Sequence, residues 1–248
     1  MKEKEKGQVL EVICNETDEI LKNKLKKLLI EICYGKEKVG IITFEETIKE
    51  LNQRISQKTD PQKAGMVGEL LFHIKSYECF KDYNHISVYL NKEERSVKKG
   101  FDVLLFDGKK VWYSEVKSME NAENIDITEA HIVKVKEAII DITDKFNSNN
   151  NNYWLTAKTN IANIETKRLE KQIAEILTKD IEKNIQKNAI TVSAVFKKCP
   201  CKIKKENIKN LINKKQKNFN TLTAVCISHS DYKKIINILK EIEKENET

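Results

Sequence analysis

Two acidic residues and a lysine near the middle of the chain have the types and spacing of a divalent-metal site. Asp102 lies near the start of the segment 100–117, and Glu115 and Lys117 lie at its end. Mg²⁺ is usually held by one or two carboxylates, with water and substrate phosphate completing its octahedron. The ion can lower the pKa of a bound water and neutralise charge on a phosphate. The pattern predicts a phosphodiesterase that uses Mg²⁺ or Mn²⁺. Asp102 and Glu115 would hold the ion with the Val116 carbonyl, and Lys117 would orient or activate water or stabilise the phosphorane.

The segment that carries these residues has the pattern of a β-hairpin. Residues 101–106 and 110–116 are rich in aromatic and β-branched residues, and residues 107–108 form an Asp-Gly turn signal between them. A two-residue loop puts Glu115 diagonal to Asp102, about 7 Å away. A four-residue loop puts the two carboxylates directly opposite. In both registers, alternation along the strands gives one face the same four side chains. They are Asp102, Tyr113, Glu115 and Lys117.

An acid followed two residues later by a lysine is a weak signal in a chain in which 33% of the residues are charged. The same spacing recurs at residues 107–109, 165–167 and 231–233. The triplet at 115–117 differs because it ends an apolar strand and has an acid on the preceding strand. The alternative is an amphipathic hairpin whose polar face is simply hydrated.

A helical pattern over residues 61–80 carries Glu69, with Asp60 expected as its N-cap. Gly65 and Gly68 each cost a helix about 1 kcal/mol relative to alanine, so they suggest a close approach of backbone. A helix pressed onto the hairpin would aim Glu69 at the metal as a third acid or an outer-shell ligand. The alternative is a solvated helix glutamate.

The remaining pattern predicts an α/β protein with a mixed central sheet flanked by helices, plus further helical additions. Further strands are expected at 8–14, 85–91, 189–196 and 221–229. Helices are expected at 16–34, 43–57, 126–146, most of 153–188, and 231–247. The 248 residues suit either one continuous domain or an N-terminal part, 1–60, packed on a core of 61–248.

Targeting signals are not expected. No run of 18 apolar residues occurs, so no membrane association is expected, and the N-terminus lacks the apolar core of a signal peptide. The six cysteines show no disulfide framework. Together these features predict a cytoplasmic protein.

The net charge of +7 suits a polyanionic partner. Residues 197–217 contain nine lysines and one acid, which makes this segment the main candidate for contact with a DNA backbone; the alternative is a solvated face in a lysine-rich chain. The candidate contacts are Lys134, Lys136, Lys197, Lys198, Lys202, Lys204 and Lys205. Because lysine greatly outnumbers arginine, backbone binding is favoured over readout of base sequence.

The motifs resemble the PD-(D/E)xK superfamily, which has a restriction-endonuclease-like fold. The resemblance assigns Glu69 to the acid of the first helix, Asp102 to the strand acid, and Glu115 and Lys117 to the E-x-K pair. Phe101 replaces the usual proline. Within the superfamily, the sequences Gly-Glu-Leu-Leu, Gly-Phe-Asp and Tyr-Ser-Glu-Val-Lys are most similar to HamA, the nuclease subunit of Hachiman defence systems.

This resemblance implies a DNA nuclease in bacterial antiviral defence that works with a helicase, HamB. Two alternatives remain at this stage. One is another enzyme of the same fold, such as a restriction endonuclease or a junction resolvase. The other is a DNA- or helicase-binding module that has lost its activity.

Overall fold

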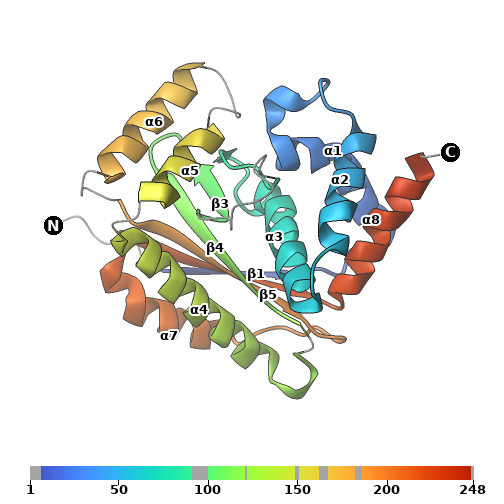
Figure 1. The fold of residues 1–248 in the computed structure, drawn as a ribbon. Helices are drawn as coiled ribbons and strands as arrows, with labels where there is room; N and C mark the ends of the chain where they lie inside the picture. The colour runs from blue at the N-terminus through green and yellow to red at the C-terminus, as the bar shows by residue number, and fades with distance from the viewer. Residues whose placement is uncertain are drawn as a thin grey trace.

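A single six-stranded mixed sheet organises the protein (Figure 1). The computed structural model describes residues 7–90, 100–120, 122–148, 151–161, 167–181 and 186–246. The strands are β1 (Gln8–Ile13), β2 (Asn84–His85), β3 (Val103–Phe106), β4 (Val111–Met119), β5 (Asn188–Phe196) and β6 (Thr221–His229). They lie in the order β1-β6-β5-β4-β3-β2. Strands β1, β6, β5 and β4 are parallel, and β3 and β2 continue the sheet antiparallel.

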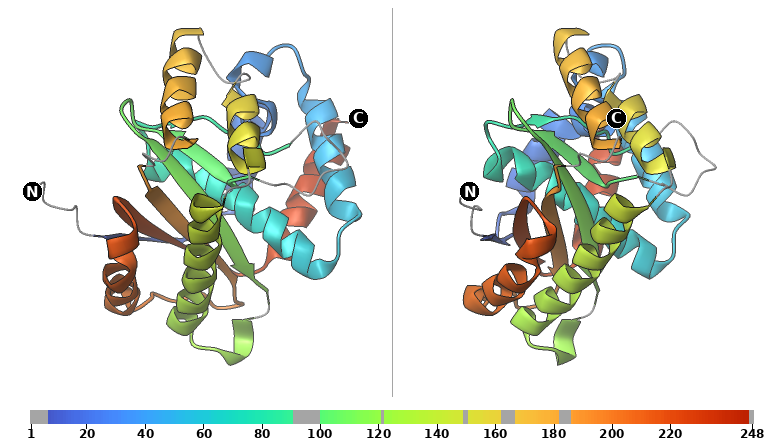
Figure 2. Two further views of the ribbon diagram at one scale, coloured as in Figure 1. Left: turned by 60° about the vertical axis from the view of Figure 1, so that its left-hand side comes forward. Right: turned by 90° about the vertical axis from the view of Figure 1, so that its left-hand side faces the viewer.

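Helices cover both faces of this sheet (Figure 2). The first face is covered by α1 (Asp18–Tyr34), α2 (Phe44–Ser56), α3 (Asp60–Cys79) and α8 (Tyr232–Asn246). The second face is covered by α4 (Ile127–Asn147), α5 (Asn151–Ile161), α6 (Lys167–Ile181) and α7 (Lys205–Lys215). Short 3₁₀ turns lie at Lys36–Lys38, Ala122–Asn124 and Gln216–Asn218. The predicted α/β fold with a mixed, helix-flanked sheet is therefore confirmed.

Two interior strands, β5 and β6, are covered on both faces, so a hydrophobic core lies on each side of the sheet. Every residue of β5 and β6 is buried. Parallel strands that are covered on both faces read as nearly continuous apolar runs. Along β5, Val192 and Ala194 pack on the first face, and Ala189 and Val195 pack on the second.

The parallel pairs require crossover connections, and helices supply them. Helices α4, α5 and α6 lie between β4 and β5, and α7 lies between β5 and β6. Helix α4 follows β4 closely, and its N-cap is Asp126, whose side chain accepts from the Thr128 and Glu129 N–H groups. The predicted cap at Asp126 is confirmed. This connection brings α4 back over the hairpin that carries the predicted site.

The strand predicted at 85–91 is wrong over most of its described length. The ladder with β3 ends at His85 in β2, followed by one further bond from the Ile86 N–H to the Leu104 carbonyl at 2.9 Å. Beyond it, the Tyr89 N–H donates to the Ile32 carbonyl at 2.8 Å, and the Leu90 N–H donates to the Cys33 carbonyl at 3.1 Å. These backbone groups bond to the end of α1 instead of continuing the ladder. Residue 91 lies outside the described residues.

Helix α3 lies close against the sheet at Gly68. A Cβ atom added at Gly68 would overlap Ser118 Oγ on β4 and come within 2.9 Å of Ala194 Cβ on β5. Gly65 has no such neighbour within 4 Å. The close approach predicted from the two glycines therefore holds at Gly68 alone. The helix also starts one residue earlier than expected, since Thr59 is its N-cap and Asp60 lies in its first turn.

Helices α1 and α2 share one core with α3 and α8. A division of the chain near residue 60 stays a prediction. Among the described residues, every helix is too short or too polar to cross a bilayer.

Candidate active site

The β3–β4 hairpin brings the two predicted metal ligands together. Phe106 pairs with Val111, so the turn contains four residues, and Gly108 adopts a φ of 89° within it. The Asp107 side chain closes the turn by accepting from two backbone N–H groups, those of residues 109 and 110. Extending this register by one residue beyond Val103 sets Asp102 opposite Glu115. Of the two predicted registers, the structure has the four-residue one.

Glu115 and Lys117 face helix α4. On β4, Trp112 and Val116 pack in the core of the first face, whereas Tyr113 packs in the core of the second face. Side chains alternate along a strand, so Glu115 and Lys117 share the second face with Tyr113. The ion pairs that these two residues form with Lys145 and Asp141 of α4 agree with this placement. The expected shared face is therefore present.

Glu115 is the most buried charged group of the site. It is 3% exposed, and its carboxylate receives Lys145 of α4 on Oε2 and Lys117 Nζ on Oε1 at 3.1 Å. Burial raises the pKa of Glu115 to about 7, with a further upward contribution from the charge of Asp102; Lys145 and Lys117 oppose the shift. Burial and the neighbouring acid therefore disfavour the charged form of Glu115, and cations beside it favour that form.

Lys117 lies between two acids. Its Nζ forms ion pairs with Glu115 and with Asp141 of α4. Burial lowers the pKa of Lys117, but the hydrogen bond to Asp141 and the charge of Glu115 outweigh it and raise the pKa above its ordinary value. Lys117 is thus held as an ammonium group. In that form it can orient a water molecule and stabilise negative charge, but it cannot accept a proton.

Asp102 is fixed by the backbone of β4. Its own N–H donates to the Ser114 carbonyl at 3.1 Å. Its Oδ2 accepts from the Val116 N–H at 2.8 Å. The carboxylate is therefore anchored at one oxygen beside Glu115 and one residue from Lys117.

The donor set fits a hard divalent cation. Asp102 and Glu115 supply carboxylate oxygens from neighbouring strands, and Mg²⁺ requires no more than one or two protein carboxylates. Within the described residues, no three His, Cys, Asp or Glu side chains lie close enough together to hold a metal ion. An ion at this site would accordingly take most of its remaining ligands from water and substrate.

Glu69 lies on the other side of the sheet. Helix α3 belongs to the first face, and the charge of Glu69 acts on Tyr89, where it adds to burial in raising the tyrosine pKa. The charges that shift the pKa of Glu115 are those of Asp102, Lys145 and Lys117. The structure thus joins three of the four predicted acidic and lysine residues, and a supporting role of Glu69 stays a prediction.

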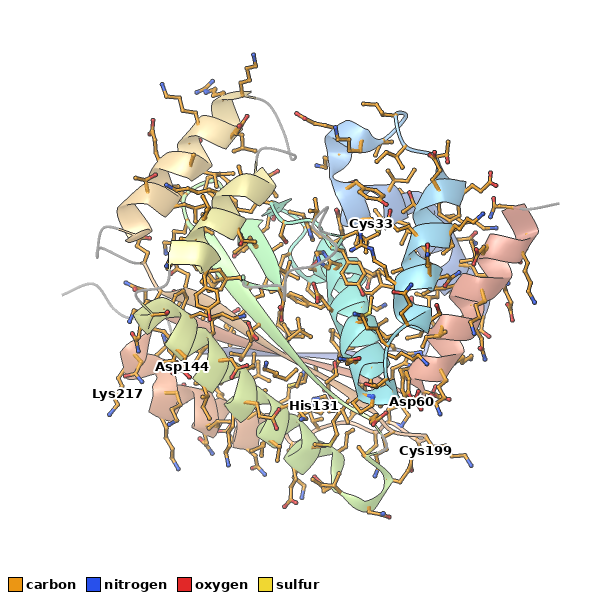
Figure 3. All side chains as sticks on the ribbon, viewed as in Figure 1. Cys33, Asp60, His131, Asp144, Cys199 and Lys217 are labelled. Atoms are coloured by element: carbon orange, nitrogen blue, oxygen red, sulfur yellow. The ribbon has the colours of Figure 1, made fainter. Side chains whose placement is uncertain are left out.

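The lysines predicted to contact DNA differ in their surroundings. Lys197 Nζ donates to the carbonyls of Ala122, Glu123 and Ile125 at 2.9–3.0 Å, which anchors the turn before α4. Lys134 pairs with Glu137, one turn further along α4. The other candidates are exposed at or near the start of α7 or on α4: Lys136, Lys198, Lys202, Lys204 and Lys205. Figure 3 shows all described side chains, including Lys217 near the end of α7.

Two site residues were not predicted from the sequence, Asp141 and Lys145. They lie one helical turn apart on α4, so they project from the same side of that helix. The signal available was this i,i+4 acid–lysine spacing on a helix expected directly after Lys117. It carried little weight because such pairs are common on solvated helices.

A second unpredicted cluster fixes α4 to the sheet. His131 is fully buried, and its Nδ1 and Nε2 lie 2.7 Å from Ser193 Oγ on β5 and 2.9 Å from Ser228 Oγ on β6. Burial lowers the pKa of His131 to about 4. The neutral ring therefore acts as a polar link between helix and sheet (Figure 3).

Comparison with known proteins gives one result. The model of the HamA family matches residues 2–242. No curated protein and no solved structure matches the chain. The matched range includes β1 to β6 and all the site residues described above.

Proposed function

The chain belongs to the HamA family, and from this premise we propose that it is the nuclease subunit of a Hachiman anti-phage defence system. The proposed reaction is hydrolysis of DNA phosphodiesters with Mg²⁺ or Mn²⁺ at a PD-(D/E)xK site. The observation that carries the proposal is the convergence of Asp102, Glu115 and Lys117 on one face of the hairpin.

The arrangement supports a division of roles. Asp102 and Glu115 would hold the ion, with the Val116 carbonyl as a further oxygen ligand. When bound, the ion supplies an activated water and neutralises charge on the phosphate. Lys117, held as an ammonium by Asp141 and Glu115, orients the attacking water and stabilises the charge that develops on the phosphate oxygens.

Substitutions at the three residues test the proposal directly. Asp102→Asn, Glu115→Gln and Lys117→Met should each reduce Mg²⁺-dependent cleavage of plasmid DNA by about 100-fold or more, because each removes a metal ligand or a charge that acts in the transition state. The assay should compare supercoiled, linear and single-stranded DNA with RNA. Such a comparison establishes both the substrate and whether cutting starts at an end.

The matched control is Asp144→Asn, an exposed acid-to-amide change on α4 (Figure 3). It should cut like the parent. If Glu115→Gln and Lys117→Met also cut like the parent, the site is wrong. If the parent cuts no nucleic acid with or without its helicase, the protein is instead a DNA- or helicase-binding module.

The proposal includes a helicase partner of the HamB type. The helicase subunit would unwind the DNA, since the chemistry proposed for this chain is hydrolysis of phosphodiester bonds alone. Expression of the native gene pair, followed by affinity purification of this chain, should recover the helicase. Comparing cleavage by the isolated subunit and by the complex then shows whether the partner restrains or stimulates the nuclease.

A further inference from the structure

Lys145 of α4 is held directly against Glu115. Its Nζ contacts Glu115 Oε2, donates to the Gly100 carbonyl at 2.6 Å, and lies 5.9 Å from the centre of the Phe101 ring. The side chain is only 15% exposed. A lysine held by a carboxylate, a carbonyl and an aromatic face is fixed far more firmly than a surface lysine.

The second oxygen of Glu115 is also engaged. Lys117 lies on Oε1 at 3.1 Å, so each oxygen of this carboxylate faces an ammonium group. The two lysines differ in their other anchors. Lys117 has Asp141 as a second acidic partner, whereas the second partner of Lys145 is the neutral carbonyl of Gly100.

A divalent ion on Glu115 would face an ammonium group on either oxygen. Two cations on one buried carboxylate repel each other, because the surrounding dielectric is low. Once the ion balances the charge of Glu115, Asp141 still holds Lys117 at the site, whereas Lys145 keeps only the neutral carbonyl of Gly100, so Lys145 is the cation that leaves.

We propose that Lys145 is a positioning residue that holds Glu115 in the metal-free protein, and that the ion displaces Lys145 from Glu115 when it binds. This inference rests on the proposed metal site. Lys145 then sets the metal affinity of the site: it orients the buried carboxylate, and it weakens ion binding by competing for the same oxygen. The lysine released by the ion remains next to the hairpin, where a DNA phosphate can accept from it.

Mn²⁺ binding by the DNA-free protein tests this exchange without measuring cleavage. In titration calorimetry, Lys145→Met should bind Mn²⁺ about tenfold or more tightly than the parent, because the competing charge is gone. Lys145→Gln keeps a hydrogen-bond donor without the charge and should also bind more tightly. Lys145→Arg keeps the charge and should not. Lys49→Met, an exposed lysine change on α2, should match the parent.

The outcomes separate this inference from the proposed function. Equal or weaker Mn²⁺ binding by both Lys145→Met and Lys145→Gln overturns the exchange, while parent binding would keep the metal site. Binding by the neutral variants but not by the parent supports the exchange strongly. Absence of Mn²⁺ binding in every variant overturns both. If Lys145→Met unfolds, Lys145→Gln and Lys145→Arg still decide the sign.

Discussion

The contact between α3 and the sheet predicts opposite effects for two neighbouring glycines. Gly68→Ala adds a Cβ that overlaps Ser118 Oγ and lies 2.9 Å from Ala194 Cβ. Gly65→Ala, three residues earlier on the same helix, meets no atom within 4 Å. Both changes raise intrinsic helix propensity by about 1 kcal/mol. The difference between them therefore isolates the packing of α3 on β4 and β5.

The expected magnitudes follow from these distances. Gly65→Ala should stabilise the protein by up to about 1 kcal/mol. Gly68→Ala should lose about 1–3 kcal/mol to overpacking, so its net effect after the gain in propensity is a loss of about 0–2 kcal/mol. The serine at 118 can rotate, but the Cβ of Ala194 belongs to a buried strand and cannot move alone.

Urea unfolding followed by circular dichroism measures both values. In thermal unfolding of a chain of this size, a change of about 1 kcal/mol in the free energy of unfolding corresponds to a shift in Tm of about 2–4 °C. Adding Ser118→Ala to Gly68→Ala should recover part of the loss, because it removes the overlapping hydroxyl. Equal stabilisation by the two glycine variants would refute the close approach of α3 to the sheet.

Three further predictions concern the site and its support. The ionised form of Glu115 binds the ion, and its pKa is raised to about 7. The affinity of the protein for Mn²⁺ should therefore fall as the pH drops below about 7, by up to about tenfold per pH unit. A Mn²⁺ affinity that calorimetry finds constant between about pH 5.5 and 7.5 would contradict the burial of this acid. His131→Ala should lower the free energy of unfolding by about 2–4 kcal/mol, because it leaves the hydroxyls of Ser193 and Ser228 without their partner. His131→Asn should lower the free energy of unfolding by less. Urea unfolding of both variants checks this, and equal stability of the alanine variant and the parent would exclude a role for the link. Glu69→Gln should reduce Mg²⁺-dependent cleavage less than Asp102→Asn does, since α3 lies on the opposite face; an equal reduction would place Glu69 in the metal shell.

His131 also makes the stability of the protein depend on pH. Its pKa falls from 6.5 to about 4 on folding, so the unfolded chain takes up the proton first as the pH drops. Stability is fully present above pH 6.5 and is lost progressively as the pH falls toward 4. The loss should be smaller in His131→Ala, measured by urea unfolding at pH 7 and pH 5.

Local patterns in the sequence predicted the hairpin well. The alternation of apolar and polar residues placed Asp102, Tyr113, Glu115 and Lys117 on one face whichever turn formed. The sequence alone allows either a two-residue or a four-residue turn. In the structure, the four-residue turn is accompanied by bonds from two backbone N–H groups to the Asp107 side chain, so local contacts within the turn accompany the observed register.

Long-range contacts were the part that the sequence did not reveal. The segment after His85 is apolar enough for a strand, but the N–H groups of Tyr89 and Leu90 bond to the end of α1. Lys145 and Asp141 look like a solvated pair until α4 folds back over the hairpin. Both cases depend on partners at least 24 residues away along the chain.

The anchoring of α4 has a further consequence for how the site changes state. His131 ties the first half of this helix to two strands, whereas Lys145 lies 14 residues later, about 21 Å along the axis. The ammonium group can therefore rotate away on its flexible stem while the helix stays in place. Exchange of Lys145 for an ion at the hairpin then requires movement of one side chain and no movement of the backbone. We therefore expect crystals grown without metal to take up Mn²⁺ by soaking and remain intact.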